Sequence, residues 1–419
     1  MSYARSLCAL GFVLAVSGFA QDPAPLTWDG LLGSVQAEPS VQASTQKVAL
    51  LEKPEGPGYW NAMELRYSAD GLDMREHKFE ARISPYAWGE RSALNAQLEA
   101  RLHVNNASRD LTVSKVLNDR YQLGLQWIIH QREKVYHEAL SKVYADRVQV
   151  EMSLTGTERF DPEDLVESQQ TLAELQGDLL GDLNDIEETE TILHKLVGAW
   201  TVIDLDTANL LTVADLKARV DSLPSQVDST LPSLRISQAR LHLAESRFQL
   251  EQTRSTNIVS YGNIGYDLKI PKAGKTGPTA LESMSAGVGI QIPIFDGRKQ
   301  DLQRRQLDLL DEKSTFLDDQ WDLERKLGQL RMEIGSLMAQ KAVLDSFAAR
   351  VDAGNLFTDY AVRAGTDPLL LLKARATSLQ SAWRSERLRY DIYASYLSML
   401  EITGVLARDP GTNHLKRKV

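Results

Sequence analysis

The sequence predicts a mainly α-helical protein with a small β part, built as two copies of one plan. Three observations lead to this fold class. Short stretches of alternating polarity come before two very long proline-free stretches, the second of which carries a sustained heptad of apolar residues, and the same punctuation recurs about 200 residues later. The chain has 419 residues, 43% hydrophobic and 25% charged, which is ordinary for folded protein.

The N-terminus has the pattern of a secretory signal peptide. Arg5 precedes an apolar run from Leu7 to Val16, and small residues follow up to Ala20. We predict that residues 1–20 are a signal peptide cleaved after Ala20. The alternative, an anchor helix, is disfavoured because an apolar run of about ten residues is shorter than the roughly 20 that span a bilayer. The single cysteine, Cys8, would leave with this segment, so we expect no disulfide, cysteine-bound metal or cysteine-linked lipid.

Two pairs of matching segments indicate an internal repeat. Pro85–Arg91 and Pro293–Lys299 stand 208 residues apart, and each ends a strand-like stretch and opens a long helical one. Gly156–Thr157 and Gly365–Thr366 each precede an Asp-Pro pair and a Leu-rich helix. A single such match is weak evidence, but the repeated order of elements favours two structural copies.

The copies divide into the following predicted elements. The first copy, 21–230, contains a short helix, a β-hairpin at 58–85, a long helix at 90–152, a return helix at 162–200 and an equatorial segment at 201–231. The second copy, 232–419, contains a helix at 233–256, a β-hairpin at 257–294, a long helix at 298–360, a return helix at 368–406 and a C-terminal tail.

The strands carry a period of two. From Met284 to Ile294 every second residue is apolar, and the residues between are Ser, Gly, Gln and Pro. Tyr59–Tyr67 and Lys78–Ser84 alternate in the same way, with charged residues on the second face. One face therefore suits lipid and the other water. A soluble, half-buried hairpin alternates identically, so the strands alone leave both interpretations open.

The helices favour the membrane interpretation. No proline separates Gly297 from Tyr360, so this segment can form one helix of about 60 residues, roughly 90 Å long. The apolar residues of 91–152 drift between registers, which indicates the same helix with less regular packing. The heptad positions of the second helix, which predict a coiled-coil seam, are Leu302, Leu309, Phe316, Leu323, Leu330, Leu337, Leu344 and Val351.

Four strands cannot close into a barrel by themselves. Lipid cannot satisfy the unpaired backbone groups at the edges of a sheet, so the edges must pair with other copies. Eight strands are about the minimum for a filled barrel, and an aqueous lumen needs more. Three copies would give twelve strands, although the count also permits dimers or tetramers.

The chain resembles the TolC-like outer-membrane factors over nearly its whole predicted mature length. The marks of the resemblance are Ile292–Arg298, similar to the family's pattern Pro, hydrophobic, Phe, Asp or Asn, Gly, Gly or Arg, and Tyr360–Thr366 leading into Leu369–Leu372. The resemblance implies a homotrimer whose twelve-stranded barrel sits in outer-membrane lipid of a Gram-negative bacterium, continued by an α-helical barrel across the periplasm. It implies the channel component of a tripartite efflux or type I secretion system, in which a periplasmic adaptor and an inner-membrane transporter drive drugs, metabolites, ions or proteins outward.

The resemblance also implies a docking site for the adaptor at the tips of the helical hairpins. The matching positions are Gly156, Thr157, Gly365 and Thr366. Small residues allow a tight reversal between two helices and leave the tip bare for a partner.

A gate between neighbouring hairpins carries over only in part. Asp164 and Tyr360 match two of the family's gate positions, and Arg363 could substitute for the third. The paired aspartates that narrow the family's pore match Leu370 and Lys373 here, so we do not expect the same acidic constriction.

Other classes of function find little support. The net charge is −10 without a basic run, which argues against nucleic acid as a partner. The seven histidines are scattered, and no phosphate loop, serine elbow or other catalytic pattern occurs, so we expect no metal, cofactor or enzymatic activity. The remaining alternative is a periplasmic coiled-coil adaptor or structural protein without a pore. Such an adaptor has one long hairpin, whereas this chain shows two with strands before each.

Overall fold

A computed structural model describes residues 25–53, 58–69, 76–158, 160–198, 202–223, 231–257, 259–269, 283–290, 298–353 and 367–417. Its first elements are α1 (Trp28–Gly33), η1 (Ser34–Ala37), α2 (Pro39–Leu51), β1 (Ala62–Ala69), β2 (Glu76–Ser84), α3 (Glu90–Ser153) and α4 (Pro162–Val197). The later elements are α5 (Val213–Ser222), α6 (Pro232–Ser255), β3 (Val259–Lys269), β4 (Met284–Ile290), α7 (Arg298–Ala353), α9 (Pro368–Thr403) and α10 (Val405–Arg408).

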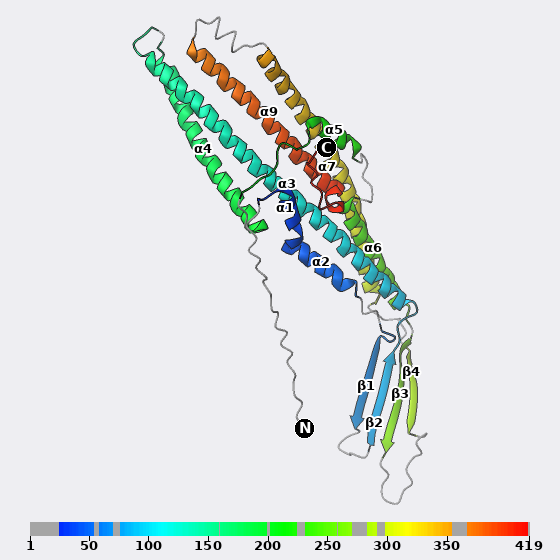
Figure 1. Cartoon of the computed structure of the whole chain (residues 1–419). Coiled ribbons are helices and arrows are strands. Elements are labelled where there is room, and N and C mark those ends of the chain that lie inside the picture. The colour runs from blue at the N-terminus through cyan, green and yellow to red at the C-terminus, as the bar shows by residue number, and fades with distance from the viewer. Residues whose placement is uncertain are drawn as a thin grey trace, which may run out of the picture.

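The molecule is long and narrow, with the strands at one end and the helix tips at the other (Figure 1). The helix α3 alone has 64 residues, which corresponds to about 95 Å at about 1.5 Å per residue. Near the sheet the helices pack side by side in the order α2, α3, α6, α7, and toward the tips α3 packs between α4 and α9, with α7 beside α9.

The sheet has the order β1-β2-β3-β4 and is antiparallel throughout. Each strand continues one helix of the layer beside it. β1 follows α2, β2 leads into α3, α6 leads into β3, and β4 comes before α7. Strand order and helix order therefore agree across the whole subunit.

Local sequence explains where the return helices begin. Both start with proline at the first position, and Asp161 and Asp367 cap them by accepting hydrogen bonds from the backbone N–H of Glu163 (2.9 Å) and Leu369 (3.1 Å). Proline lacks the N–H group that would be unsatisfied there, and an N-cap carboxylate satisfies one that remains.

The end of the second return helix differs from the prediction of 368–406. The helix α9 ends at Thr403, because Gly404 adopts φ 72° in the left-handed region, and a separate turn, α10, follows. A Cβ on Gly404 would lie 2.2 Å from Cγ of Pro232, the first residue of α6. This close approach stacks α9 and α6 end to end between α3 and α7.

The main core lies midway along the helices. It joins α1, the middle of α3, the lower part of α9, α5 and the C-terminal segment. Tyr121 of α3 is fully buried there; its hydroxyl donates to the carbonyl of Thr412 (3.1 Å) and accepts from the backbone N–H of His414 (2.8 Å). Backbone bonds also tie Leu26 to Val202 (2.8 Å) and Leu211 to Leu415 (2.9 Å), so a belt of three distant segments wraps the helices.

The structure confirms the mainly helical class with one small four-stranded antiparallel sheet. The trimer, the closed barrel and the internal repeat stay predictions. The predicted signal peptide at 1–20 and the motif at 291–297 lie outside the described residues.

Candidate functional site: the two-faced sheet and the helical tips

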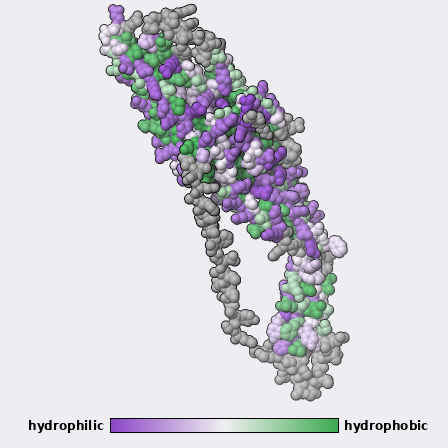
Figure 2. All heavy atoms as spheres, viewed as in Figure 1, coloured by the Kyte–Doolittle hydropathy of each residue, from purple (hydrophilic) through white to green (hydrophobic). Residues whose placement is uncertain are grey.

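One face of the sheet is apolar from edge to edge. The register brings the odd-numbered positions of β1 and β2 beside the even-numbered positions of β3 and β4, which share one face. Many of these side chains are open to the outside, and Leu65 of the first strand is 80% exposed. The hydrophobic atoms over the strands contrast with the mostly hydrophilic surface of the helices (Figure 2). The rows across the sheet are Met63, Ile83, Gly262 and Val288, then Leu65, Ala81, Ile264 and Ala286, then Tyr67, Phe79, Tyr266 and Met284.

The opposite face is polar and balanced in charge. Glu80 accepts a hydrogen bond from the Asn263 amide (2.7 Å), and the Arg82 guanidinium lies 3.6 Å from the centre of the Tyr261 ring. Opposite charges directly across neighbouring strands favour the observed register, because a slip by two residues would keep the apolar face but separate them. The facing pairs are Glu64 and Arg82, Arg66 and Glu80, and Lys78 and Asp267.

Three glycines of the strands make room on this polar face. A Cβ at Gly289 would lie 2.4 Å from the Tyr261 ring, and one at Gly287 would lie 2.6 Å from the Asn263 side chain. Gly265 faces Ser285 in the same way. Larger side chains therefore lie flat across their glycine neighbours on the polar face.

The subunit leaves two boundaries open. β1 and β4 are the outer strands of the described sheet, and α2 and α7 border the helix layer on the same two sides. Along α7 several large apolar side chains face outward, among them Trp321 (77% exposed) and Met332 (69%). The edge β4 thus continues into an exposed apolar helix edge.

The first helical tip is a tight reversal with small residues at its end. Gly156 has φ 90° and a Cβ there would meet nothing within 4 Å. Thr157 is exposed, and its hydroxyl donates to the carbonyl of Leu154 (2.7 Å). Exposed apolar side chains flank this turn at Met152 (56%) and Val166 (62%). The described part of the tip therefore presents a small, partly apolar surface.

A buried polar cluster lies directly behind this tip. The Glu151 carboxylate, only 3% exposed as a residue, accepts hydrogen bonds from Arg147 Nε (2.8 Å) and from the Ser168 hydroxyl (3.1 Å) of α4. Burial acts to lower the pKa of Arg147, but the hydrogen bond to Glu151 and the charge of that carboxylate raise it overall. Asp164 lies 3.9 Å from the same guanidinium. Its observed partner is thus within its own hairpin.

The second tip carries four further predicted site residues, Tyr360, Arg363, Gly365 and Thr366, all of which lie outside the described residues. The predicted docking positions Gly156 and Thr157 are placed together at the first tip, and Asp164 lies in the first turn of α4, which begins at Pro162. The docking and gating roles stay predictions.

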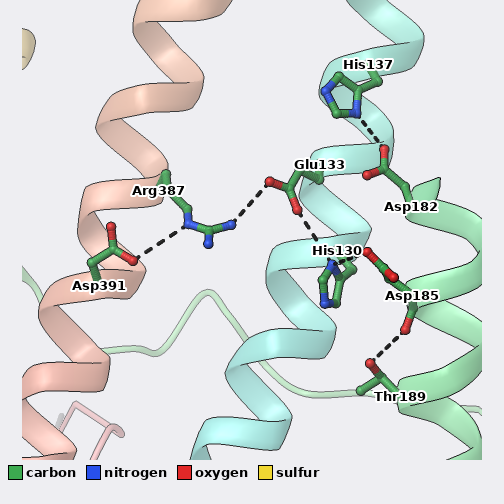
Figure 3. A network of polar contacts seen from close by, with 8 residues as sticks. All are labelled: His130, Glu133, His137, Asp182, Asp185, Thr189, Arg387 and Asp391. Carbon is green, nitrogen blue, oxygen red and sulfur yellow. Dashed lines mark hydrogen bonds and ion pairs between the residues drawn. The ribbon is translucent and has the colours of Figure 1, made fainter. Parts of the chain in front are cut away.

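A chain of polar contacts links the two hairpins farther from the tips (Figure 3). His137 of α3 contacts Asp182 of α4 (2.6 Å), and His130 lies 3.6 Å from Glu133 and 3.8 Å from Asp185. In the described ranges, no three His, Cys, Asp or Glu side chains are grouped as metal ligands. These histidines therefore join α3 to α4 through carboxylates.

The same chain continues to α9. Arg387 donates to Glu133 of α3 (3.2 Å) and lies 3.6 Å from Asp391. Burial raises the pKa of Asp391 despite the neighbouring guanidinium. One turn nearer the tips, Tyr136 stacks on Trp383 with ring centres 5.6 Å apart. Polar and aromatic contacts thus hold the first hairpin against the second.

Sequence patterns gave no sign of these contacts. Trp383, Arg387 and Glu133 occupy ordinary helix positions, and the residues that they meet are more than 240 positions away in the chain. From the sequence, a carboxylate near a helix end, such as that of Glu151, is expected to be exposed to solvent. Only the packing of α3 against α4 shows that Glu151 is buried.

The solved structures that are similar to this chain include two outer-membrane proteins, VceC and MtrE, and the channel-forming protein CusC. VceC of Vibrio cholerae is 13% identical, with 89% of this chain and 95% of that chain covered and a TM-score of 0.63. The open-state MtrE channel of Neisseria gonorrhoeae is 12% identical, with 93% and 90% covered and a TM-score of 0.62. CusC, described in terms of transmembrane channel formation, is 12% identical, with 88% and 90% covered and a TM-score of 0.64.

The fold is that of the outer-membrane channels. The resemblance to the TolC-like proteins therefore holds for the architecture, which spans nearly all of both chains in each comparison. No family model and no curated protein matches the sequence. None of the described helices has both the length and the apolar composition to cross a bilayer.

Proposed function

We propose that this chain is one subunit of a homotrimeric outer-membrane channel that gives transported compounds an exit path across the periplasm. The observation that carries the proposal is the two-faced sheet, apolar and exposed on one side and charge-paired on the other. A face of this kind fits contact with acyl chains, and the polar face then lines water.

The open boundaries support assembly into a ring. A lipid-exposed strand edge has no water to satisfy its backbone groups, so β1 must pair with β4 of a neighbouring copy. Because the helix order follows the strand order, the same head-to-tail contact brings α7 of one copy to α2 and α4 of the next. A single interface therefore closes the barrel and the helical tube together. Three copies give twelve strands, enough for a lumen.

The helical tips fit the docking of a periplasmic adaptor, which would connect the tube to an inner-membrane transporter. In the fold's orientation they lie at the end farthest from the sheet (Figure 1), where a partner in the periplasm would reach them. The bare Gly156 and the exposed Thr157 make the first tip accessible. The predicted second-tip positions Gly365 and Thr366 complete the proposed docking surface.

Charge placed on either face of β1 tests the proposal. Leu65→Arg should weaken the assembly by roughly 2–4 kcal/mol if Leu65 meets the middle of the bilayer, whereas Ser68→Arg on the polar face should cost about 1 kcal/mol or less. The measurement is the heat-sensitive oligomer in detergent-solubilised outer membranes, together with conductance in planar bilayers. We expect loss of both for Leu65→Arg alone.

Two outcomes would count against the channel. Equal effects of Leu65→Arg and Ser68→Arg would show that the two faces meet the same environment. Recovery of the unaltered chain only as a periplasmic monomer would favour the adaptor or structural alternative.

A further inference from the structure

A small polar pocket lies in the belt that wraps the helices. Its volume is about 210 Å³, below the roughly 300–1,000 Å³ of pockets that enclose drug-sized ligands. The pocket therefore has room for one small chemical unit. Three segments that are far apart in the sequence line it, with Trp28 and Asp29 from α1, Asp204 and Asp206 from the segment before α5, and Asn413 and Lys416 from the C-terminal segment.

Backbone hydrogen bonds hold these segments in place. The N–H of Leu26 donates to the carbonyl of Val202 (2.8 Å), and the N–H of Asp204 donates to the carbonyl of Leu26 (2.9 Å). On the C-terminal side, the N–H of Arg417 donates to the carbonyl of Asn209 (2.8 Å). The walls of the pocket are thus ordered before any ligand arrives, which lowers the entropy that binding would lose.

Trp28 is the lining residue that points to a ligand. It is only 4% exposed, and its Nε1 atom has no hydrogen-bond partner among the described residues. The outer edge of its six-membered ring packs on α3, because a Cβ on Gly124 would lie 2.7 Å from both Cη2 and Cζ3. Nε1 belongs to the five-membered ring, at the end of the indole away from that contact. A buried donor without an acceptor is unfavourable, and an acceptor placed in the pocket would satisfy it.

Carboxylates lie around this donor. Asp29, Asp204 and Asp206 are exposed and line the same pocket. The pKa of the Asp206 carboxyl lies below its ordinary value, chiefly because the Asn209 side chain donates a hydrogen bond to it (2.7 Å). Asp206 is therefore ionised at neutral pH. The three carboxylates do not form a group that could hold a metal ion, and their oxygens can accept hydrogen bonds from an organic ligand.

Donors complete the pocket. The Asn413 side-chain oxygen accepts from the backbone N–H of Leu415 (3.0 Å), which leaves its amide nitrogen as a donor, and Lys416 adds an ammonium group. A cationic ligand would leave the N–H groups of Trp28 and Lys416 without acceptors, and an anionic ligand would meet three carboxylates. A polyhydroxylated ring suits both sets, because each hydroxyl donates one hydrogen bond and accepts others.

The belt lies midway along the helices, far from the sheet (Figure 1). Gly124, on which Trp28 packs, is about 50 Å from Glu90, the first residue of α3, at about 1.5 Å per residue. In the proposed channel this level lies in the periplasm. Segments that wrapped the helices from inside would fill the duct, so the belt belongs on the outer surface of the tube. The cell-wall glycan is a sugar polymer of the periplasm that this surface would meet.

We propose that the pocket of the belt binds one sugar ring of the cell-wall glycan. The Trp28 N–H donates to an oxygen of the sugar, and the carboxylates of Asp29, Asp204 and Asp206 accept from its hydroxyl groups. The contact would hold the tube against the cell wall at the middle of its length. The choice of the cell wall as the source of the sugar rests on the proposed function, since only a tube across the periplasm meets it.

Cosedimentation with purified peptidoglycan sacculi tests the site. Full-length protein in detergent should sediment with the sacculi, and excess N-acetylglucosamine should release it. Trp28→Phe keeps an aromatic ring but removes the N–H donor, and should weaken binding about fivefold, the effect of one hydrogen bond. Because Trp28 lies in the core, far-ultraviolet circular dichroism checks that this variant is folded. Asp204→Ala changes an exposed side chain and should weaken binding by a similar factor.

Asp221→Ala is the matched control. Asp221 is also exposed and lies on α5 of the same belt, but outside the pocket. This variant should bind sacculi as the parent protein does. Equal binding of Trp28→Phe, Asp204→Ala and Asp221→Ala would overturn the proposal. Release by free lysine rather than by N-acetylglucosamine would assign the pocket to an ammonium group, which also overturns it.

Conductance of the same preparations in planar bilayers separates this inference from the channel hypothesis. If the protein conducts but does not bind sacculi, the glycan site is refuted while the proposed function stands. If it binds sacculi through Trp28 and Asp204 but does not conduct, the proposed function fails and the sugar site stands.

Discussion

Gly404→Ala tests the junction that stacks α9 on α6. The substitution should destabilise the protein in two ways, through the backbone conformation of residue 404 and through a steric clash with Pro232. Alanine at φ 72° costs about 1 kcal/mol relative to glycine. The new Cβ would also lie 2.2 Å from Cγ and 2.4 Å from Cδ of Pro232, more than 1 Å inside the roughly 3.5 Å optimum for carbon contacts.

Pro232 is buried, so the clash cannot be relieved by a side chain moving into solvent. Overpacking of this kind costs about 1–3 kcal/mol, and we expect a total loss of about 2–4 kcal/mol in the free energy of unfolding. The measurement is urea unfolding of the detergent-solubilised protein, followed by far-ultraviolet circular dichroism. The midpoint should shift to lower urea.

Gly89→Ala is the matched control. Gly89 has φ 83° and ψ −8°, in the same left-handed region as Gly404, and the nearest atom to a Cβ there would lie at an ordinary contact distance of 3.9 Å, so only the backbone cost of about 1 kcal/mol remains. In Gly404→Ala with Pro232→Ala, removal of the ring should recover most of the steric part. If Gly404→Ala and Gly89→Ala unfold at the same urea concentration, the close stacking of the two helices is refuted.

Two further substitutions test electrostatics. Burial raises the pKa of the Glu401 carboxyl, and the hydrogen bond from Asn118 (2.6 Å) offsets this only in part. The folded state then binds the proton more tightly than the unfolded state, so the contribution of Glu401 to stability falls as pH rises from the ordinary glutamate pKa through the folded value. We expect Glu401→Gln to gain stability relative to the parent protein between about pH 4 and pH 7 in urea unfolding; a constant difference across that range would contradict the assignment. In the sheet, Lys78→Asp places like charges opposite Asp267 and should cost about 0.2–1 kcal/mol, measured as a lower temperature of oligomer dissociation, and adding Asp267→Lys should restore it. Failure of the double exchange to recover stability would contradict the pairing.

The heptad pattern of the second long helix, α7, can be recognised in the sequence because that helix lies at the border of the helix layer. Among the described elements, α7 packs mainly against α6 and α9, so one apolar stripe repeats every seven residues. Leu323 on that stripe is buried and its neighbours at Phe316 and Leu330 are half-buried. The sequence therefore predicts the helix and its packing face together.

The drifting register of the first long helix has the opposite cause. α3 lies inside the layer and changes partners along its length, from α2 and α6 near the sheet to α4 and α9 near the tips. No single stripe can serve four neighbours. Leu117 and Leu125 are buried in the main core, whereas Leu140 is buried in a second cluster with Leu175 of α4 and Ala376 of α9, and a search for one period cannot show this division.

The polar contacts between hairpins lay beyond sequence reasoning for a different reason. A charged residue on a long helix is usually solvated, and its type does not tell which of them will meet an opposite charge from a distant segment. Glu90 illustrates this. It reads as an acidic residue in the first turn of a helix, yet it is buried and supports the turn that leads into α3.

The two helices that border the layer toward the tips, α4 and α7, contain glycines that lower the stability of a single subunit. Glycine inside a helix costs about 0.5–1 kcal/mol relative to alanine, because it restricts a flexible backbone and packs nothing. In a free subunit these glycines serve no contact, since a Cβ at any of them would meet nothing within 4 Å. In the proposed ring, however, α7 of one copy lies against α4 of the next, and residues without side chains let the two backbones approach closely while exposed apolar neighbours fill the contact. The glycines that cost stability within one subunit would then be required for close packing between subunits of the tube. The glycines are Gly177 and Gly181 of α4 and Gly328 and Gly335 of α7, and the exposed apolar residues are Val166 and Leu180 of α4 and Met332 and Val343 of α7.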